Sequence, residues 1–278
     1  MIWIFSLSAG AVFSVLYAIL GGLCGPELLL ILPLFLGGTA AALILVVLFA
    51  MAVIAPIDVS KPIKKPSKFY FRLFELFNDF ICTSARIRVV IGGKEKLNAG
   101  EKYLFVYNHR SNFDPMLISK CFKKYRILMI SKPQNFKKFL AGKCIHRAGF
   151  MAINRENDRE AAKTILKAIG YLGEGYSVAV APEGTRNQSG IGLLPFRNGA
   201  FKIATKAKVP ICVLNLNGTE KVKHNFPLKS TKVFIDIVSV ITPEEYADMT
   251  TSEIGDIVAA KMTENIEKRN GVKIAENV

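Results

Sequence analysis

Residues 103–122 read YLFVYNHRSNFDPMLISKCF, and this stretch decides the fold class. Its apolar run at 103–107 predicts a buried strand. Asp114 and Pro115 predict the start of a helix, with Asp114 as the N-cap and Pro115 at the first helical position. Similar short apolar runs predict further strands at 87–91, 126–130, 176–181, 211–216 and 233–241. Helices separate several of these strands, so we expect an α/β fold with a mostly parallel or mixed sheet covered by helices.

Two capping signals predict helices in the second half of the chain. Asn157-x-x-Glu160 and Thr250-x-x-Glu253 each place a side chain where it can accept a bond from the first helical turn. The apolar spacing predicts the residues that each helix buries: Ala161, Ile165, Leu166, Ile169 and Leu172 in the first, and Ile254, Ile257, Val258, Met262 and Ile266 in the second.

The first 57 residues hold one charged side chain, Glu27, and no Lys or Arg. The uncharged runs 2–24 and 28–55 are each longer than the about 20 residues that a membrane-spanning helix needs, and a Gly-Pro pair at residues 25–26 predicts a turn between them. This pattern predicts a membrane hairpin of two helices over residues 1–57; one broken or partly buried segment is the alternative. A cleaved signal peptide is disfavoured, because the run lacks a basic start and a short apolar centre.

Residues 58–278 carry all 37 Lys and Arg and 21 of the 22 Asp and Glu. Five of the cations crowd the exit of the predicted hairpin: Lys61, Lys64, Lys65, Lys68 and Arg72. With the predicted hairpin, the positive-inside rule predicts a multi-pass protein of the cell membrane whose charged domain lies on the cytoplasmic face, against an anionic membrane surface.

Residues 58–85 are predicted to form a basic amphipathic segment, and residues 86–278 the α/β domain. Aromatic and apolar side chains recur on one face of a helix expected at 66–82. Such a helix either lies in the membrane interface or packs on the globular core, and the sequence leaves both open.

The composition also excludes several classes of protein. An apolar content of 51% excludes disorder and a collagen-like chain. The positive charge comes with no nucleic-acid-binding motif, so we expect no nucleic acid as a partner. Wide spacing of the five cysteines argues against a disulfide framework and a structural zinc site, and favours a reducing compartment: Cys24, Cys82, Cys121, Cys144 and Cys212. We expect no metal.

His109 and Asp114 are the candidate catalytic pair. His109 follows the strand predicted at 103–107, and the carboxyl end of a parallel strand is where α/β proteins bind ligands. Asp114 comes five residues later, close enough to reach one imidazole nitrogen, which would leave the other free to take a proton from an alcohol. The ordinary alternatives are a helix cap for Asp114 and a loop histidine for His109.

Two further segments favour an anion. Glu183-Gly184-Thr185-Arg186 follows the strand predicted at 176–181, where a glycine lets backbone N–H groups approach and an arginine grips phosphate with a planar fork. Arg155 ends the segment 149–155 just before a predicted helix. Each segment alone also fits an ordinary turn with a solvated arginine.

Taken in order, these segments resemble the four blocks of the glycerolipid acyltransferase family. His109-x4-Asp114, Gly149…Arg155, Glu183-Gly184-Thr185-Arg186 and Val209-Pro210-Ile211 follow one another at the family's spacing, over roughly residues 86–240. The stretch Phe196–Phe201 resembles the family's Phe-Lys-x-Gly-Ala, with Arg197 for lysine, and Lys132 stands where the family often has a lysine. Ala181 replaces a usual aromatic residue, and Pro133 follows Lys132.

The resemblance implies transfer of a fatty acyl chain from a thioester, coenzyme A or acyl carrier protein, to the free hydroxyl of lysophosphatidic acid. His109 would be the base and Asp114 its orienting group. Arg155 and Arg186 would bind the acceptor phosphate, helped by Thr185 and the Gly184 backbone, while Glu183 would hold the loop or a polar group of the acceptor. No cofactor beyond the thioester co-substrate is implied. Another acceptor, a lysophospholipid or glycerol 3-phosphate, and a non-catalytic lipid-binding protein are the alternatives.

Overall fold

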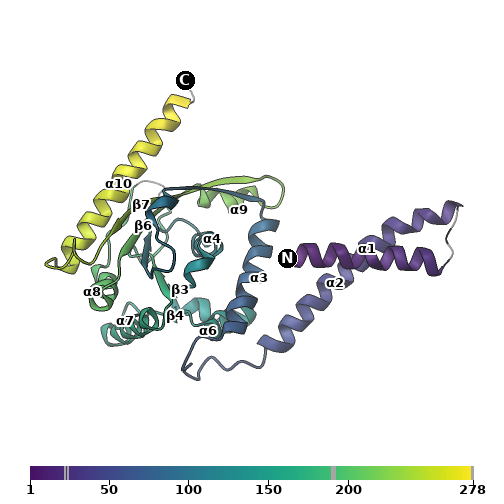
Figure 1. Ribbon diagram of the computed structural model, residues 1–278, viewed down its shortest axis with the longest axis horizontal. Helices are drawn as coiled ribbons and strands as arrows, with labels where there is room; N and C mark the ends of the chain where they lie inside the picture. The colour runs from purple at the N-terminus through teal and green to yellow at the C-terminus, as the bar shows by residue number, and fades with distance from the viewer. Residues whose placement is uncertain (22, 24, 189–191, 277–278) are drawn as a thin grey trace. The chain divides into compact units, whose positions relative to one another are not determined.

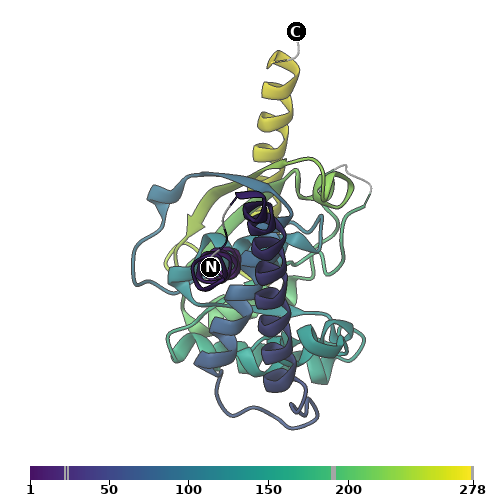
Figure 2. The same ribbon diagram turned by 90° about the vertical axis from the view of Figure 1, so that its right-hand side faces the viewer.

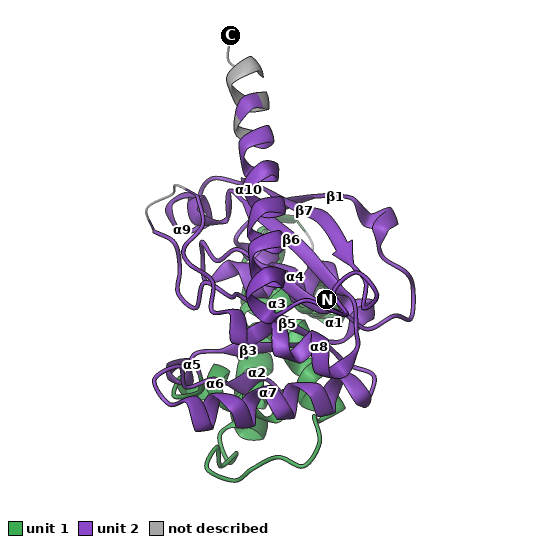
Figure 3. Ribbon diagram, turned by 90° about the vertical axis from the view of Figure 1, so that its left-hand side faces the viewer, with its two compact units in different colours: residues 1–81, 136–148 green, residues 82–135, 149–278 purple. Residues whose placement is uncertain are grey.

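The computed structural model describes residues 1–21, 23, 25–188 and 192–276. It divides into two compact units, coloured separately in Figure 3. Unit 1 holds residues 1–81 and 136–148, and unit 2 holds residues 82–135 and 149–278. The three segments predicted above are defined by composition and membrane placement, so they stay a prediction beside this division.

Unit 2 is built on one mixed sheet of seven strands, in the order β1-β7-β6-β2-β5-β3-β4. All neighbouring strands are parallel except β6 and β7, which run antiparallel. The α/β fold with a mixed sheet is therefore confirmed. The strands are β1 (Ile87–Gly92), β2 (Leu104–Tyr107), β3 (Ile127–Ser131), β4 (Met151–Ala152), β5 (Ser177–Val180), β6 (Ile211–Asn217) and β7 (Thr231–Ile241).

Helices cover both faces of this sheet (Figure 1). The step from β2 to β3 runs one way along the sheet and the steps from β4 to β5 and from β5 to β6 run the other way. Since such crossovers are right-handed, α4 lies on one face and α7 and α8 on the other. The long α10 packs on β6 and β7 and then extends past the sheet (Figure 2). These helices are α4 (Phe113–Cys121), α7 (Asp158–Gly173), α8 (Lys202–Ala207) and α10 (Thr251–Glu276), with short helices α5 (Pro133–Phe136) and α9 (Val222–Asn225) in the connections.

Both capping signals form hydrogen bonds at the predicted helix starts, whereas one residue that was predicted to be buried is exposed. Thr250 and Glu253 form a reciprocal box, in which each backbone N–H donates to the other side chain. The Asn157 side chain accepts from the Glu160 N–H. Leu166, however, is 68% exposed, because the buried stripe of α7 runs through Ala168 and Leu172, about half a turn of the helix away.

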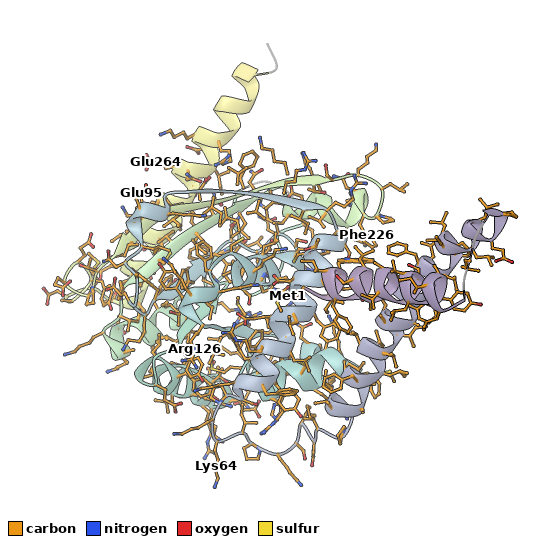
Figure 4. All side chains as sticks on the ribbon, turned by 45° about the vertical axis from the view of Figure 1, so that its right-hand side comes forward. Met1, Lys64, Glu95, Arg126, Phe226 and Glu264 are labelled. Carbon is orange, nitrogen blue, oxygen red and sulfur yellow. The ribbon has the colours of Figure 1, made fainter. Side chains whose placement is uncertain are left out.

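In unit 1, α1 (Ile2–Leu20) and α2 (Ile31–Ile54) are separate helices joined by a 3₁₀ turn at Gly25–Leu30. Both are long and apolar enough to cross a membrane. They pack through small residues: a Cβ on Gly10 would lie 2.7 Å from the Phe35 carbonyl oxygen. Their outward side chains are almost entirely carbon (Figure 4). Close helix contact through glycine and serine is typical of membrane helices.

The exit of α2 packs against two further helices of unit 1, α3 (Lys68–Ser84) and α6 (Phe139–Ala148). Ala50 and Ile54 of α2 form a small core with Leu73 and Cys144. The Tyr70 hydroxyl donates to the Val53 carbonyl at 3.1 Å. One face of α3 is therefore covered by α2 and α6. Neither alternative given above, the membrane interface or the globular core, included these helices as its neighbours.

Candidate active site

The His109 and Asp114 side chains meet at the carboxyl end of β2. The imidazole Nδ1 lies 2.8 Å from Asp114 Oδ2, so the contact expected from the five-residue spacing is present. Asp114 is fully buried, whereas the imidazole is 19% exposed. No hydrogen bond within the described residues occupies Nε2. The partly accessible ring is thus held at one nitrogen with the other available to a substrate.

Asp114 is not the N-cap of α4, which corrects the helix start given above. The helix begins at Phe113 after Asn112, so Asp114 is its second residue. Its Oδ2 accepts the backbone N–H groups of Arg110 and Ser111, at 2.6 and 2.7 Å, which belong to the loop before the helix. The carboxylate therefore closes the loop around His109, because one oxygen gathers two N–H groups and the imidazole.

Glu183 ties this loop to two other segments. One carboxylate oxygen accepts the His109 N–H at 2.7 Å, and the other accepts the Leu194 N–H at 2.9 Å. The Asn187 N–H in turn donates to the His109 carbonyl at 2.7 Å. Burial raises the pKa of Glu183, and the two N–H groups offset part of that rise. Glu183 thus holds the loop, one of the two roles expected for it.

Arg155 and Gly184 are neighbours in the folded chain. Gly184 has φ +71°, and a Cβ there would lie 3.2 Å from Arg155 Nη1. The guanidinium is half-buried; that burial, and then the nearby Arg197 cation, lower the pKa of Arg155. An arginine whose charged form is disfavoured by burial and by a second arginine nearby makes a place where an anion is stabilised.

The remaining predicted residues are less closely gathered. Thr185 is exposed, and its hydroxyl accepts from Lys132 Nζ at 3.2 Å. Arg186 is exposed. Sequence reasoning noted Lys132 and Arg197 as features of a resemblance and assigned neither to the site. Lys132 directly follows β3, and this position after a strand end was the available signal.

Tyr107 and Asn108 lie at the carboxyl end of β2, and the sequence patterns did not identify either of them as a site residue. The Tyr107 ring meets the His109 ring edge-on, with centroids 6.1 Å apart. Burial, and then the Asp114 carboxylate, raise the pKa of Tyr107, so its phenol stays neutral and cannot replace His109 as the base. Buried Asn108 joins β2 to β6 by bonds with both backbone groups of Leu216. Apolar periodicity counts such residues as strand interior.

Comparison with protein families matches residues 88–216 to the family described as Acyltransferase. Residues 88–216, just under half of the chain, therefore carry a domain that matches the acyltransferase family. It spans all the residues placed around His109 above, from the end of β2 to Arg197.

The acyltransferase domain also resembles curated proteins. A 1-acyl-sn-glycerol-3-phosphate acyltransferase of Chlamydomonas reinhardtii is 29% identical over 69% of this chain and 60% of its own length. That of Borreliella burgdorferi is 27% identical over 64% of this chain and 73% of its own. A human 1-acyl-sn-glycerol-3-phosphate acyltransferase alpha is 33% identical over 45% of this chain and 44% of its own length. The match thus spans about three fifths of the algal relative.

Among solved structures, the crystal structure of a 1-acyl-sn-glycerophosphate (LPA) acyltransferase from Thermotoga maritima aligns with a TM-score of 0.60. The alignment covers 97% of this chain and 98% of that one, at 21% sequence identity. The likeness extends the fold assignment beyond the family segment to the N-terminal helices.

Proposed function

We propose that this acyltransferase moves a fatty acyl group from an acyl thioester to the free hydroxyl of 1-acyl-sn-glycerol 3-phosphate and forms phosphatidic acid. The observation that carries the proposal is the 2.8 Å contact between His109 Nδ1 and Asp114, which leaves Nε2 available as a base. A lipid-binding protein without catalysis has no need of such a pair.

The reaction follows from this geometry. His109 Nε2 takes the proton of the acceptor hydroxyl as its oxygen attacks the thioester carbonyl carbon. Buried Asp114 stabilises the imidazolium that forms. The tetrahedral intermediate then collapses: the C–S bond breaks, the sulfur leaves with its electron pair, and the imidazolium returns a proton to it. Ester and free thiol are the products, and no cofactor takes part.

The cations near Gly184 supply the acceptor's phosphate site in this proposal. Arg155 lies against the Gly184 backbone and within electrostatic reach of Arg197, so a bound phosphate relieves the repulsion between the two. Thr185 and exposed Arg186 extend this site toward solvent.

We also propose that α1 and α2 anchor the chain in the cell membrane as a multi-pass hairpin, with the catalytic domain on the cytoplasmic face. The apolar exposed sides of both helices support the anchor, and the cations after α2 support the orientation and an anionic lipid surface as partner.

The direct test offers the purified full-length protein in detergent a panel of acceptors with acyl-CoA and acyl carrier protein donors. The panel comprises lysophosphatidic acid, a lysophospholipid with a larger head group, and glycerol 3-phosphate. We expect phosphatidic acid from lysophosphatidic acid and none with His109→Ala. Preference for another acceptor would overturn the proposal that lysophosphatidic acid is the substrate. Turnover by His109→Ala would overturn the proposed mechanism.

A further inference from the structure

Unit 1 brings a distant piece of sequence to the exit of α2. The inserted segment, residues 136–148, contains α6, whose Cys144 belongs to the same small core as Ala50 and Ile54 of α2. Lys143 Nζ donates to the carbonyl of Ala55, which is the C-cap of α2. The inserted segment therefore lies beside the C-terminal end of α2.

The lysine-bearing loop after α2 is held against the same segment. The His146 Nε2 lies 3.1 Å from the Lys61 carbonyl oxygen. The Ser67 N–H donates to the Arg147 carbonyl at 3.0 Å. One bond near each end of the loop thus holds residues 61–68, with their lysines, against the inserted segment.

The resulting surface is strongly cationic and carries an exposed aromatic ring. Residues 58–81 and 136–148 together hold nine Lys and Arg against three Asp and Glu. Lys137, Lys138 and Phe139 are consecutive and exposed, and Phe139 is 63% exposed. The Lys143 ammonium lies 5.8 Å from the Phe139 ring centroid. Lysines around an exposed aromatic ring are typical of surfaces that bind anionic lipid and insert among its head groups.

We propose that the inserted segment is a second membrane contact, in which Lys137 and Lys138 bind anionic phospholipid head groups and Phe139 inserts beside the end of α2. A lipid surface is the occupant because this cluster continues from the exposed apolar sides of α2. The inference rests on the membrane anchor proposed above and is independent of the chemistry at His109.

The test uses the full chain with one reporter tryptophan. Trp3→Phe removes the single native tryptophan, and Phe139→Trp places a new one at the exposed position. The protein is reconstituted in vesicles of phosphatidylcholine with or without phosphatidylglycerol, each containing lipid brominated near the head groups. We expect quenching of the reporter that is stronger with phosphatidylglycerol and weaker at high salt.

Charge reversal distinguishes lipid binding from mere proximity. Lys137→Glu with Lys138→Glu should lower the equilibrium constant between the lipid-inserted and free states of the segment roughly fivefold or more for each lysine replaced, and quenching should fall accordingly. The matched pair Lys202→Glu with Lys206→Glu, also exposed lysines, should leave the quenching unchanged. Unquenched reporter in both vesicle types, or equal loss with both pairs, would overturn the proposal. His109→Ala should leave the quenching unchanged, so a failed acyltransferase assay would not bear on this result.

Discussion

At the scale of single residues, a single oxygen atom organises the site. Asp114 Oδ2 receives two loop N–H groups and the His109 ring, while Oδ1 is buried with no hydrogen-bond partner among the described residues. The carboxylate thus combines a structural task, closing the loop, with an electrostatic one, stabilising the imidazolium. Separate substitutions distinguish the two tasks.

His109→Ala is expected to lower turnover by about 10²–10⁴-fold, the range a positioned base supplies. The loop remains closed, because the Arg110 and Ser111 N–H groups still reach Asp114. Turnover and thermal unfolding of the detergent-solubilised protein are the measurements. An unchanged melting temperature shows that chemistry alone was removed, and near-normal turnover would exclude His109 as the base.

Asp114→Asn is expected to lose most of the activity as well. An amide oxygen can accept the same N–H groups but carries no charge to stabilise the imidazolium, and its NH₂ takes the buried position of Oδ1, where an unpaired donor costs about 1–3 kcal/mol. Kinetics and thermal unfolding of Asp114→Asn and Asp114→Ala give the comparison. A fully active Asn variant would reduce Asp114 to a loop-closing residue.

The raised pKa of Glu183 predicts how the free energy of unfolding depends on pH. Its pKa is raised above the ordinary 4.5 in the folded chain, chiefly by burial, so the folded state binds more protons than the unfolded state above that pH. Stability contributed by Glu183 therefore falls as the pH rises from about 4.5 toward the raised value. The unfolding free energy of the wild type, minus that of Glu183→Gln, should decrease over this window. An increase would show that the two N–H bonds outweigh burial.

At the scale of elements, the loops after three strands form the site together. The loop after β2 supplies the catalytic pair, the loop after β5 supplies Glu183 and Gly184, and the segment after β4 supplies Arg155. Glu183 and the Asn187 N–H bind the first loop to the second, so the loops move only at the cost of buried hydrogen bonds.

Gly184→Ala tests how these loops meet. The new Cβ would press on the Arg155 guanidinium, and a positive φ adds strain. Gly175→Ala is the matched control, since Gly175 has φ +90° with nothing within 4 Å. Both variants should lose similar stability, whereas only Gly184→Ala should raise the KM for the lysolipid. Equal KM values in the two variants would remove Arg155 from the acceptor site.

At the scale of the whole molecule, charge is segregated along the chain. An apolar hairpin with one charged residue precedes a domain with every Lys and Arg. The hairpin helices meet through glycine and serine and present their larger apolar side chains outward, as a lipid solvent requires.

The orientation is testable with sealed membranes. Trypsin added outside right-side-out cells should leave residues 58–278 intact, because the proposed orientation places their many Lys and Arg in the cytoplasm. Inverted vesicles should lose the domain to the same treatment, and detergent should expose it in both preparations. Digestion from outside intact cells would reverse the proposed topology.

The sequence by itself determined the features that depend on near neighbours. Apolar runs at 103–107 and 211–216, the capping boxes and the hairpin all follow from patterns within one element, where local spacing decides which face is buried. The five-residue step from His109 to Asp114 is also local, which is why their contact was predicted.

Only the tertiary structure decided which distant segments meet. Packing placed Arg155 beside Gly184, joined Glu183 to the His109 N–H, and brought residues 136–148 to the end of α2. Packing also made the Asp114 carboxylate an acceptor for the loop N–H groups instead of a helix cap, and it left Leu166 exposed. These contacts depend on the order of strands in the sheet and on side chains many residues apart, and the periodicity of a single element carries no information about either.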